Sequence, residues 1–196
     1  MRHQQFRSTI GSIGSRLAMV LALALATAGV AVGVGAPAQA ATTTVCANLG
    51  VPAGWVVTHA QMAPAGCGYF TKYTITTDLY NGMSICSITA VPTGWVATHA
   101  QVLPDCANNN RLTITSNLYN GMMVCAVAPL PTGWVATYAQ DVPSCSSNNR
   151  LTITSNLYDG MTVCSVWGVP TGWIITQTQT YQPSCWYTNR STIRRG

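Results

Sequence analysis

The side chains that could perform catalysis are few, and they do not recur together along the chain. The 196 residues include four Asp, no Glu and three His. A glycosidase needs two carboxylates at a defined separation, and a common class of serine hydrolase needs a Gly-x-Ser-x-Gly turn, which does not occur here. Walker, HExxH and dinucleotide-binding motifs do not occur either. We therefore expect a protein that is not an enzyme and uses no cofactor.

Eight cysteines are the other reactive residues, and their even number in a small exported chain indicates disulfides. A zinc site would normally show a Cys-x-x-Cys pair, and four scattered Asp are too few for calcium, so we expect no metal. Pairing within repeated units serves every unit identically and gives Cys46–Cys67, Cys86–Cys106, Cys125–Cys145 and Cys164–Cys185. The staggered alternative is Cys67–Cys86, Cys106–Cys125, Cys145–Cys164 and Cys46–Cys185.

Tryptophan is the residue best suited to binding a ligand, because one Trp stands before a short β-prone segment in each unit. Period-two alternation would place Trp95, Ala97, His99 and Gln101 on one face of a strand. A Trp beside a second ring and an amide could stack on a sugar and bond its hydroxyls. The candidate ligand-binding residues are Trp55, His59, Gln61, Trp95, His99, Gln101, Trp134, Tyr138, Gln140, Trp173, Gln177 and Gln179.

Other interpretations of these residues stay open. A single Trp in each small β unit is also typical of a core residue packed against a disulfide, and the repeated Gln could satisfy backbone groups at a strand edge. Three aromatic residues occur only in the last unit and indicate either a cap or a special contact site: Trp167, Trp186 and Tyr187. A basic residue precedes Thr-Ile in each unit and could contact an anion or stand on a solvated face: Lys72, Arg111, Arg150 and Arg190.

These residues belong to a unit of about 39 residues that recurs four times. The first Cys of the unit recurs at steps of 40, 39 and 39 residues, and the second Cys at steps of 39, 39 and 40. Pro-x-Gly-Trp and Thr-Ile keep the same spacing. We expect repeats at residues 41–83, 84–122, 123–161 and 162–196, the last of them a C-terminal cap.

The local pattern within each unit indicates β-structure. Residues 111–118 alternate between apolar and polar, residues 122–127 form a second run, and residues 95–102 form a third. Asn120-Gly121 lies between the first two and is typical of a tight hairpin turn. A unit of this size cannot bury a sufficient core alone. The expected fold is therefore all-β, with four tandem disulfide-stapled units joined by hairpins in a linear stack or a closed ring.

Residues 1–40 have the pattern of a secretory signal peptide. Three arginines precede an apolar run at residues 17–34, and Ala38-Gln39-Ala40 matches a cleavage pattern. A membrane anchor is the alternative, but the second half of the run is rich in Ala and Gly, and Pro37 precedes the cleavage pattern. We expect a secreted chain that begins at Ala41 and has no transmembrane anchor after cleavage.

Charge is scarce, and this narrows the class of partner. Charged residues make up 7% of the chain, whereas about a quarter is typical of soluble domains. The net charge of +5 falls to +2 without residues 1–40, because three of the nine basic residues lie there. Nucleic-acid binding needs clustered Lys and Arg, so we expect no nucleic-acid partner and an uncharged ligand instead.

The first unit reads Cys-x5-Pro-x-Gly-Trp-Val-x-Thr-x8-Cys from Cys46 to Cys67, and the chain closes in Thr192-Ile193-Arg194-Arg195. This pattern resembles Cys-paired tandem repeats of exported bacterial proteins whose role is unknown, and the resemblance covers residues 41–196. It implies export and modularity, and it transfers no activity.

The leading functional hypothesis is an exported, non-catalytic, multivalent binding protein that is lectin-like towards neutral glycans or a cell-envelope component. Several weak copies of one site would gain strength by avidity. One alternative is a structural or protein-interaction repeat protein of the cell surface. Another is an exported enzyme inhibitor or toxin that engages its target through loops. The oligomeric state does not follow from the sequence.

Overall fold

Strands dominate the computed structural model, which describes residues 41–62, 65–186 and 188–196. The predicted leader 1–40 and Tyr187 lie outside the described residues. The described part begins with β1 and a short 3-10 helix (Ala47–Leu49) and continues in strands to its end. The strands are β1 (Thr42–Cys46), β2 (Val56–Gln61), β3 (Lys72–Thr76), β4 (Met83–Cys86), β5 (Val96–Val102), β6 (Asn110–Thr115), β7 (Met122–Cys125), β8 (Val135–Asp141), β9 (Asn149–Thr154), β10 (Met161–Cys164), β11 (Trp173–Gln182) and β12 (Thr188–Arg195).

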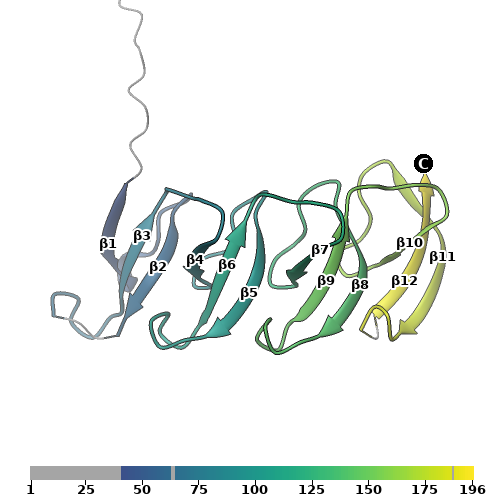
Figure 1. Cartoon of the computed structure of the whole chain (residues 1–196). Coiled ribbons are helices and arrows are strands. Elements are labelled where there is room, and N and C mark those ends of the chain that lie inside the picture. The colour runs from purple at the N-terminus through teal and green to yellow at the C-terminus, as the bar shows by residue number, and fades with distance from the viewer. Residues whose placement is uncertain (1–40, 63–64, 187) are drawn as a thin grey trace, which may run out of the picture. The chain divides into compact units, whose positions relative to one another are not determined.

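The strands form four triplets of the same antiparallel order, which we call repeats 1 to 4. β3 lies between β1 and β2, and β6, β9 and β12 lie in the same way between the other strands of their triplets. The repeats follow one another in a row, with β1 and β11 at opposite ends (Figure 1). The all-β prediction is confirmed, and of its two arrangements the structure has the linear one.

The predicted hairpins between repeats are wrong. β6 pairs with β4 and β5, whereas β7 pairs with β5 and β9, so the segments on either side of Asn120-Gly121 do not pair with each other. The expected hairpin turn needs positive φ at both central residues. Here Gly121 has a φ of 84° and Asn120 has no positive φ. The turn closes through Met122 N, which donates to the Tyr119 carbonyl at 3.1 Å, and it passes the chain from one repeat to the next.

The side chain of Asn120 in this turn makes hydrogen bonds within the repeat that follows the turn. Asn120 Oδ1 accepts hydrogen bonds from Thr154 Oγ1 and from the backbone N of Ser155, each at 2.8 Å. Asn120 precedes β7 and Thr154 ends β9, so the side chain ties together the ends of two paired strands. At the preceding turn Asn81 Oδ1 accepts the same two bonds, from Thr115 Oγ1 and Ser116 N, and at the following turn Asp159 Oδ1 accepts the backbone bond from Arg195 N.

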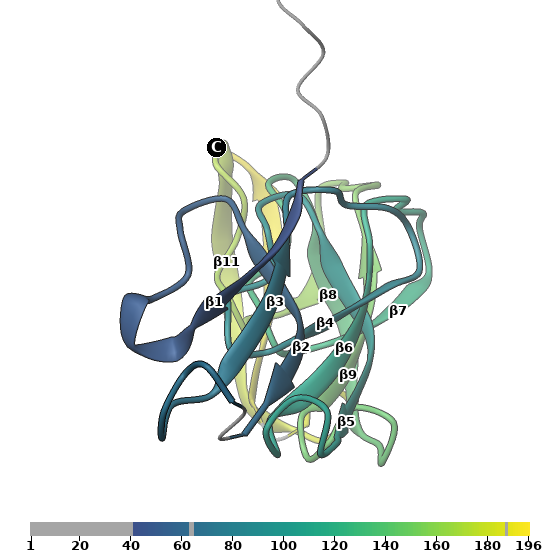
Figure 2. The same ribbon diagram turned by 90° about the vertical axis from the view of Figure 1, so that its left-hand side faces the viewer.

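Each apolar core is shared by neighbouring repeats. Ile85, Leu112 and Ile114 of repeat 2 pack with Cys125 and Cys145 of repeat 3. Equivalent clusters join repeats 1 and 2 and repeats 3 and 4. Figure 2 looks along the row from repeat 1, so the later repeats lie behind it. The disulfide of each following repeat therefore covers the apolar face of the sheet before it.

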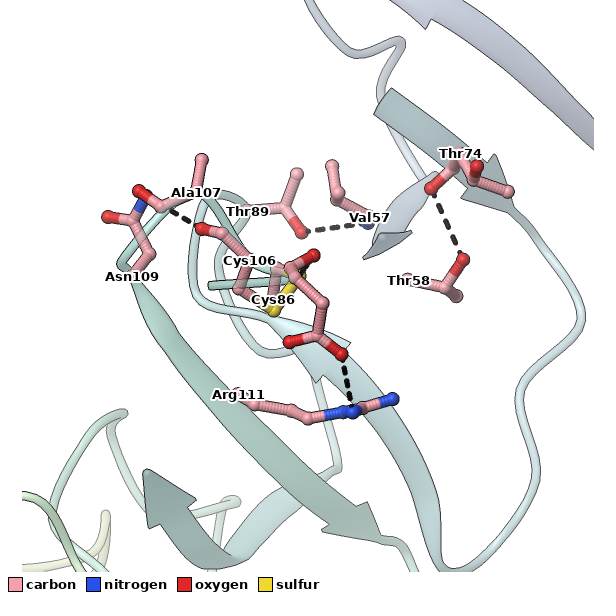
Figure 3. The surroundings of a disulfide bond; sticks show 10 residues. Val57, Thr58, Thr74, Cys86, Thr89, Cys106, Ala107, Asn109 and Arg111 are labelled. Carbon is pink, nitrogen blue, oxygen red and sulfur yellow. Dashed lines mark hydrogen bonds and ion pairs between the residues drawn. A yellow bond between two sulfur atoms is a disulfide. The ribbon is translucent and has the colours of Figure 1, made fainter. Parts of the chain in front are cut away.

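The predicted within-unit disulfides are confirmed in all four repeats: Cys46–Cys67, Cys86–Cys106, Cys125–Cys145 and Cys164–Cys185. Figure 3 shows the second of them close to repeat 1, where the backbone N of Val57 donates to Thr89 Oγ1 at 3.4 Å. Both Cys86 and Cys106 are completely buried. Burial at the junction makes this disulfide a packing surface as well as a covalent link.

Removing the side-chain bonds of Asn120 should destabilise the fold. Asn120→Ala leaves Thr154 and Ser155 without their acceptor, and we expect a loss of about 0.5–1.5 kcal/mol in the free energy of unfolding, because water can reach these exposed groups. Chemical denaturation measures this loss. Asn156→Ala is the matched control, because Asn156 is exposed and its backbone N rather than its side chain makes the local hydrogen bond. Equal losses in the two variants would contradict the role of Asn120.

Removing an internal disulfide should cost more than removing the terminal one. Each disulfide closes a loop of about 20 residues, worth about 3 kcal/mol in the chain-entropy model. Cys125→Ala with Cys145→Ala also removes buried sulfur from a shared core, whereas Cys46→Ala with Cys67→Ala removes a half-buried pair. Guanidinium denaturation should therefore show the larger loss for the internal pair. Identical losses would mean that the disulfides act by loop closure alone.

Candidate functional site

In each repeat one strand (β2, β5, β8 or β11) begins at or just after the repeated Trp, and we call it the Trp-bearing strand. A β-bulge determines which of its side chains reach solvent. In β5, Ala97 pairs with Ile114 and His99 pairs with the adjacent Thr113, so Thr98 is an extra residue. The Thr98 hydroxyl donates to the Thr113 carbonyl at 3.2 Å. The same hydrogen bond, at the same distance, is made by Thr58, Thr137 and Thr176. The bulge explains why Thr recurs at this position.

The bulge overturns the predicted alternation of this strand. Ala97 and Ala100 both lie on the buried face, opposite Ile114 and Leu112. His99 is exposed on the other face. Trp95 precedes β5 and packs against the same core cluster as Ala97. The prediction that Trp95, Ala97, His99 and Gln101 share one face is therefore wrong, because one extra residue shifts the phase of the strand.

The four repeated tryptophans are half-buried. Each of them packs against a different core cluster: Trp55, Trp95, Trp134 and Trp173. Packing against the core accounts for the buried part of each ring. The remaining part of each ring reaches solvent. The interpretation as a core residue and the interpretation as a binding surface are thus compatible for the same side chain.

The other candidate residues lie away from the tryptophans on the exposed face. The residue just after the bulge (His59, His99, Tyr138 or Gln177) has a threonine as its cross-strand neighbour, and the glutamine two positions later has a basic residue. The residues on this face are His59, His99, Tyr138, Gln177, Gln61, Gln101, Gln140 and Gln179; all of them are exposed except Gln140, which is half-buried. This face offers hydroxyl, amide and ring groups, but it does not bring them together with Trp.

The basic residues of this face are held by internal partners in two repeats. Arg111 donates to Asp105 at 2.6 Å, next to the Cys86–Cys106 disulfide (Figure 3). Arg190 donates to Thr162 Oγ1 at 2.8 Å. The Arg111 side chain is 38% exposed, so this ion pair contributes little to stability, about 1 kcal/mol at most.

Hollows lined by tryptophan occur at the junctions between repeats. One, of about 210 Å³, is bounded by Pro131 and Trp134 of repeat 3 and by Trp167 and Pro170 of repeat 4. Trp167 is 39% exposed. The hollow thus contains two indole rings from adjacent repeats, and the side chains that line it carry no charge.

A hollow of the same construction lies between repeats 1 and 2. It measures about 380 Å³ and is bounded by Pro52 and Trp55 of repeat 1 and by Thr89, Pro92 and Thr93 of repeat 2. Thr89 occupies the position in its repeat that Trp167 occupies in repeat 4. The second ring is therefore particular to the junction of repeats 3 and 4.

A third hollow is lined mainly by hydroxyl groups. It measures about 480 Å³ and lies between repeats 1 and 2, where it includes Thr58, Thr76, Tyr80, Ser84 and Arg111. Groups of this kind can bond sugar hydroxyls, but the stacking surface of an indole is lacking among the residues that line it. The two-tryptophan hollow is therefore the better candidate for a ligand site.

The sequence marked Trp167 as particular to the last repeat, as a cap or a special contact site, but did not identify it as a partner of Trp134. The repeat pattern draws attention to positions that recur, and Trp167 stands where the other repeats have Leu49, Thr89 and Ala128. An isolated aromatic residue at an otherwise variable position was the available signal. Its proximity to Trp134 depends on how consecutive repeats pack, which the sequence alone does not show.

In the described part of the chain, no group of three or more His, Cys, Asp or Glu side chains is placed to hold a metal ion. The described residues contain no helix that is long and apolar enough to span a membrane. Comparison with known proteins finds no matching family model, no significantly similar curated protein and no significantly similar solved structure. The four disulfides, which require an oxidising environment to form, are the feature that bears on localisation.

The core role of Trp95 and the exposed position of His99 lead to different expectations for their alanine variants. Trp95→Ala removes a ring that packs against a core cluster, and we expect a loss of about 3 kcal/mol in the free energy of unfolding. His99→Ala should stay within about 0.5 kcal/mol of wild type, because the side chain is exposed. Urea denaturation of both variants checks this. A large loss for His99→Ala would place that residue in the core instead.

Proposed function

We propose that the chain is an exported, non-catalytic binding protein for neutral, hydroxyl-rich ligands such as the glycans of a cell envelope. The observation that carries this proposal is the hollow between repeats 3 and 4, where Trp134 and Trp167 line one uncharged cavity. Sugar rings present apolar faces that stack on aromatic rings, and small-ligand sites combine such surfaces with a few polar groups. Thr132 and Thr171 supply hydroxyls at the same hollow.

The second tryptophan-lined hollow supports a multivalent mode of binding. The hollow at Trp55 is built from the same turns, but it has Thr89 where the other has Trp167. We expect it to bind the same class of ligand more weakly. Two sites on one chain would strengthen the attachment to a polymer, because the second binding event becomes intramolecular. A repeating glycan is therefore a better ligand than a free monosaccharide.

Export fits both the disulfides and the pattern of residues 1–40. Disulfides form and persist in oxidising compartments, and each repeat has one. An uncharged ligand fits the low charge of the chain, since 7% of its residues are charged. The proposed site needs neither a catalytic carboxylate nor a metal, because stacking and hydrogen bonding suffice for binding.

Tryptophan fluorescence and calorimetry test this proposal. Titration with a panel of neutral oligosaccharides and cell-wall fragments should shift the emission of wild type, because Trp134 and Trp167 are partly open to solvent. Trp167→Ala should weaken binding about tenfold, equivalent to about 1.4 kcal/mol. Trp186→Ala is the matched control, because Trp186 is 43% exposed and does not line this hollow. It should bind as wild type does.

Two outcomes would contradict the proposal. The first is no binding by wild type across the whole panel in calorimetry. The second is an equal loss of affinity in Trp167→Ala and Trp186→Ala, which would place the ligand elsewhere. Because Trp167 is exposed, we expect its variant to keep the wild-type unfolding midpoint, so a lost signal would report binding rather than folding.

A further inference from the structure

The same backbone hydrogen bond joins each repeat to the one before it. The backbone N of an alanine in the Trp-bearing strand donates to the carbonyl that precedes the second Cys of the next repeat. The distances are 2.8, 2.9 and 2.9 Å, for Ala60 to Asp105, Ala100 to Ser144 and Ala139 to Ser184. The chain thus uses one kind of contact at all three junctions.

The apolar part of this contact is buried to the same degree at each junction. Two small apolar residues at the start of the Trp-bearing strand lie within shared core clusters of neighbouring repeats. Their exposed fractions are between 0% and 3%, for Val56, Val57, Val96, Ala97, Val135 and Ala136. The following repeat therefore excludes water from this surface.

In repeat 4 the same surface is open. Ile174 and Ile175 occupy the two apolar positions and are 41% and 46% exposed. Thr178 occupies the alanine position. We call these three residues the end face. β11 is the last strand of its sheet and pairs with β12 within the described residues, and it has no charged side chain. A long uncharged edge strand is a template for pairing with another chain.

At the other end of the row, repeat 1 presents the complementary surface. Cys46 and Cys67 are half-buried, whereas the six cysteines of repeats 2 to 4 have exposed fractions of 0–3%. The residue before the second Cys is Gly66, which occupies the position of Asp105, Ser144 and Ser184. We call Cys46, Cys67 and Gly66 the first disulfide face. It lacks the preceding strand that covers its counterparts in the described part of the chain.

We propose that the end face of one molecule binds the first disulfide face of a second copy of this chain. The contact reproduces the three internal junctions, so Ile174 and Ile175 pack against the Cys46–Cys67 disulfide and the backbone N of Thr178 donates to the carbonyl of Gly66. The two surfaces are different, so the interface is heterologous and repeats in one direction. The product is a head-to-tail chain of molecules that continues the row of repeats.

The composition of the end face makes this contact weaker than an internal junction. Thr178 replaces Ala, and Ser191 replaces the Leu112 and Leu151 of repeats 2 and 3. Ser191 is buried, and its hydroxyl lies 2.6 Å from Ser165 Oγ and 3.4 Å from Thr178 Oγ1. These polar groups are satisfied within repeat 4, but they reduce the apolar area offered to a partner. Without a covalent linker, we expect association to depend on protein concentration.

Sedimentation velocity of the oxidised, full-length exported chain tests the proposal. Wild type should show a weight-average mass that rises with concentration beyond that of a dimer. Ile175→Arg places a charge on the end face and should remain monomeric. Met123→Arg is the matched control, because Met123 is also a large exposed side chain, 50% exposed, but lies in β7 and outside both faces. It should associate as wild type does.

A mixing experiment identifies the geometry of the contact. Labelled Ile175→Arg retains an intact first disulfide face, so it should join wild-type chains at one end and shorten them as its proportion rises. Pairing of β11 with β11 about a two-fold axis would instead exclude the variant from the assemblies and stop at dimers.

Three results would overturn the proposal. One is a wild-type monomer at all concentrations up to about 1 mM, where a contact of about 4 kcal/mol would already be populated. Another is association that Ile175→Arg leaves unchanged. The third is the exclusion of labelled Ile175→Arg from wild-type assemblies. Since Ile175 is exposed, an unchanged unfolding midpoint for its variant shows that the loss is one of association.

Discussion

The fold depends on one constraint, which is that a triplet of strands of this size cannot cover its own apolar face. The disulfide of the following repeat covers that face, as Cys125 and Cys145 do over Ile114 and Leu112. A small β unit buries too little surface to be stable alone, so the cover has to come from a neighbour. The disulfides therefore stabilise the chain twice, by limiting the unfolded state and by filling the space between sheets.

The small side chains beneath the disulfides follow from the same constraint. Ala97 and Ala100 both face the next repeat, and their size lets its chain approach closely enough for the backbone bond from Ala100 to Ser144. Two residues three positions apart cannot share a face of a regular strand. The bulge at Thr98 makes this possible, and its hydroxyl satisfies the Thr113 carbonyl at the irregularity.

Local patterns predicted a large part of this architecture. The repetition of the cysteines favoured pairing within repeats over the staggered set, because it serves every unit identically, and alternation around Thr113 and Ile114 predicted a strand. The bulge was not predictable, because one extra residue is not visible in a short period-two pattern. The role of Asn120 was also missed: its turn resembles a hairpin locally, but its side chain binds Thr154 in a strand that lies far along the chain.

Local sequence patterns also identified only part of the candidate site. The repeated tryptophans were identified because they recur, and the structure shows why one ring can both pack and reach solvent. The partner ring, Trp167, lies in the next repeat and at a position that varies, so only the packing of consecutive repeats brings it into the hollow of Trp134. His99 was expected to share a face with Trp95 and Ala97, and the unforeseen bulge places it on the opposite face from Ala97.

The placement of the disulfides within repeats also determines how the chain would respond to mechanical load. A pull on the two ends acts on the junctions in series, and no disulfide crosses any of the three. Once a junction opens and β6 separates from β4 and β5, the segment from Cys106 to Cys125 can extend, whereas the loop from Cys86 to Cys106 is bypassed by its covalent bond. The chain would lengthen in limited steps, and each extended segment would be short enough to refold when the load falls.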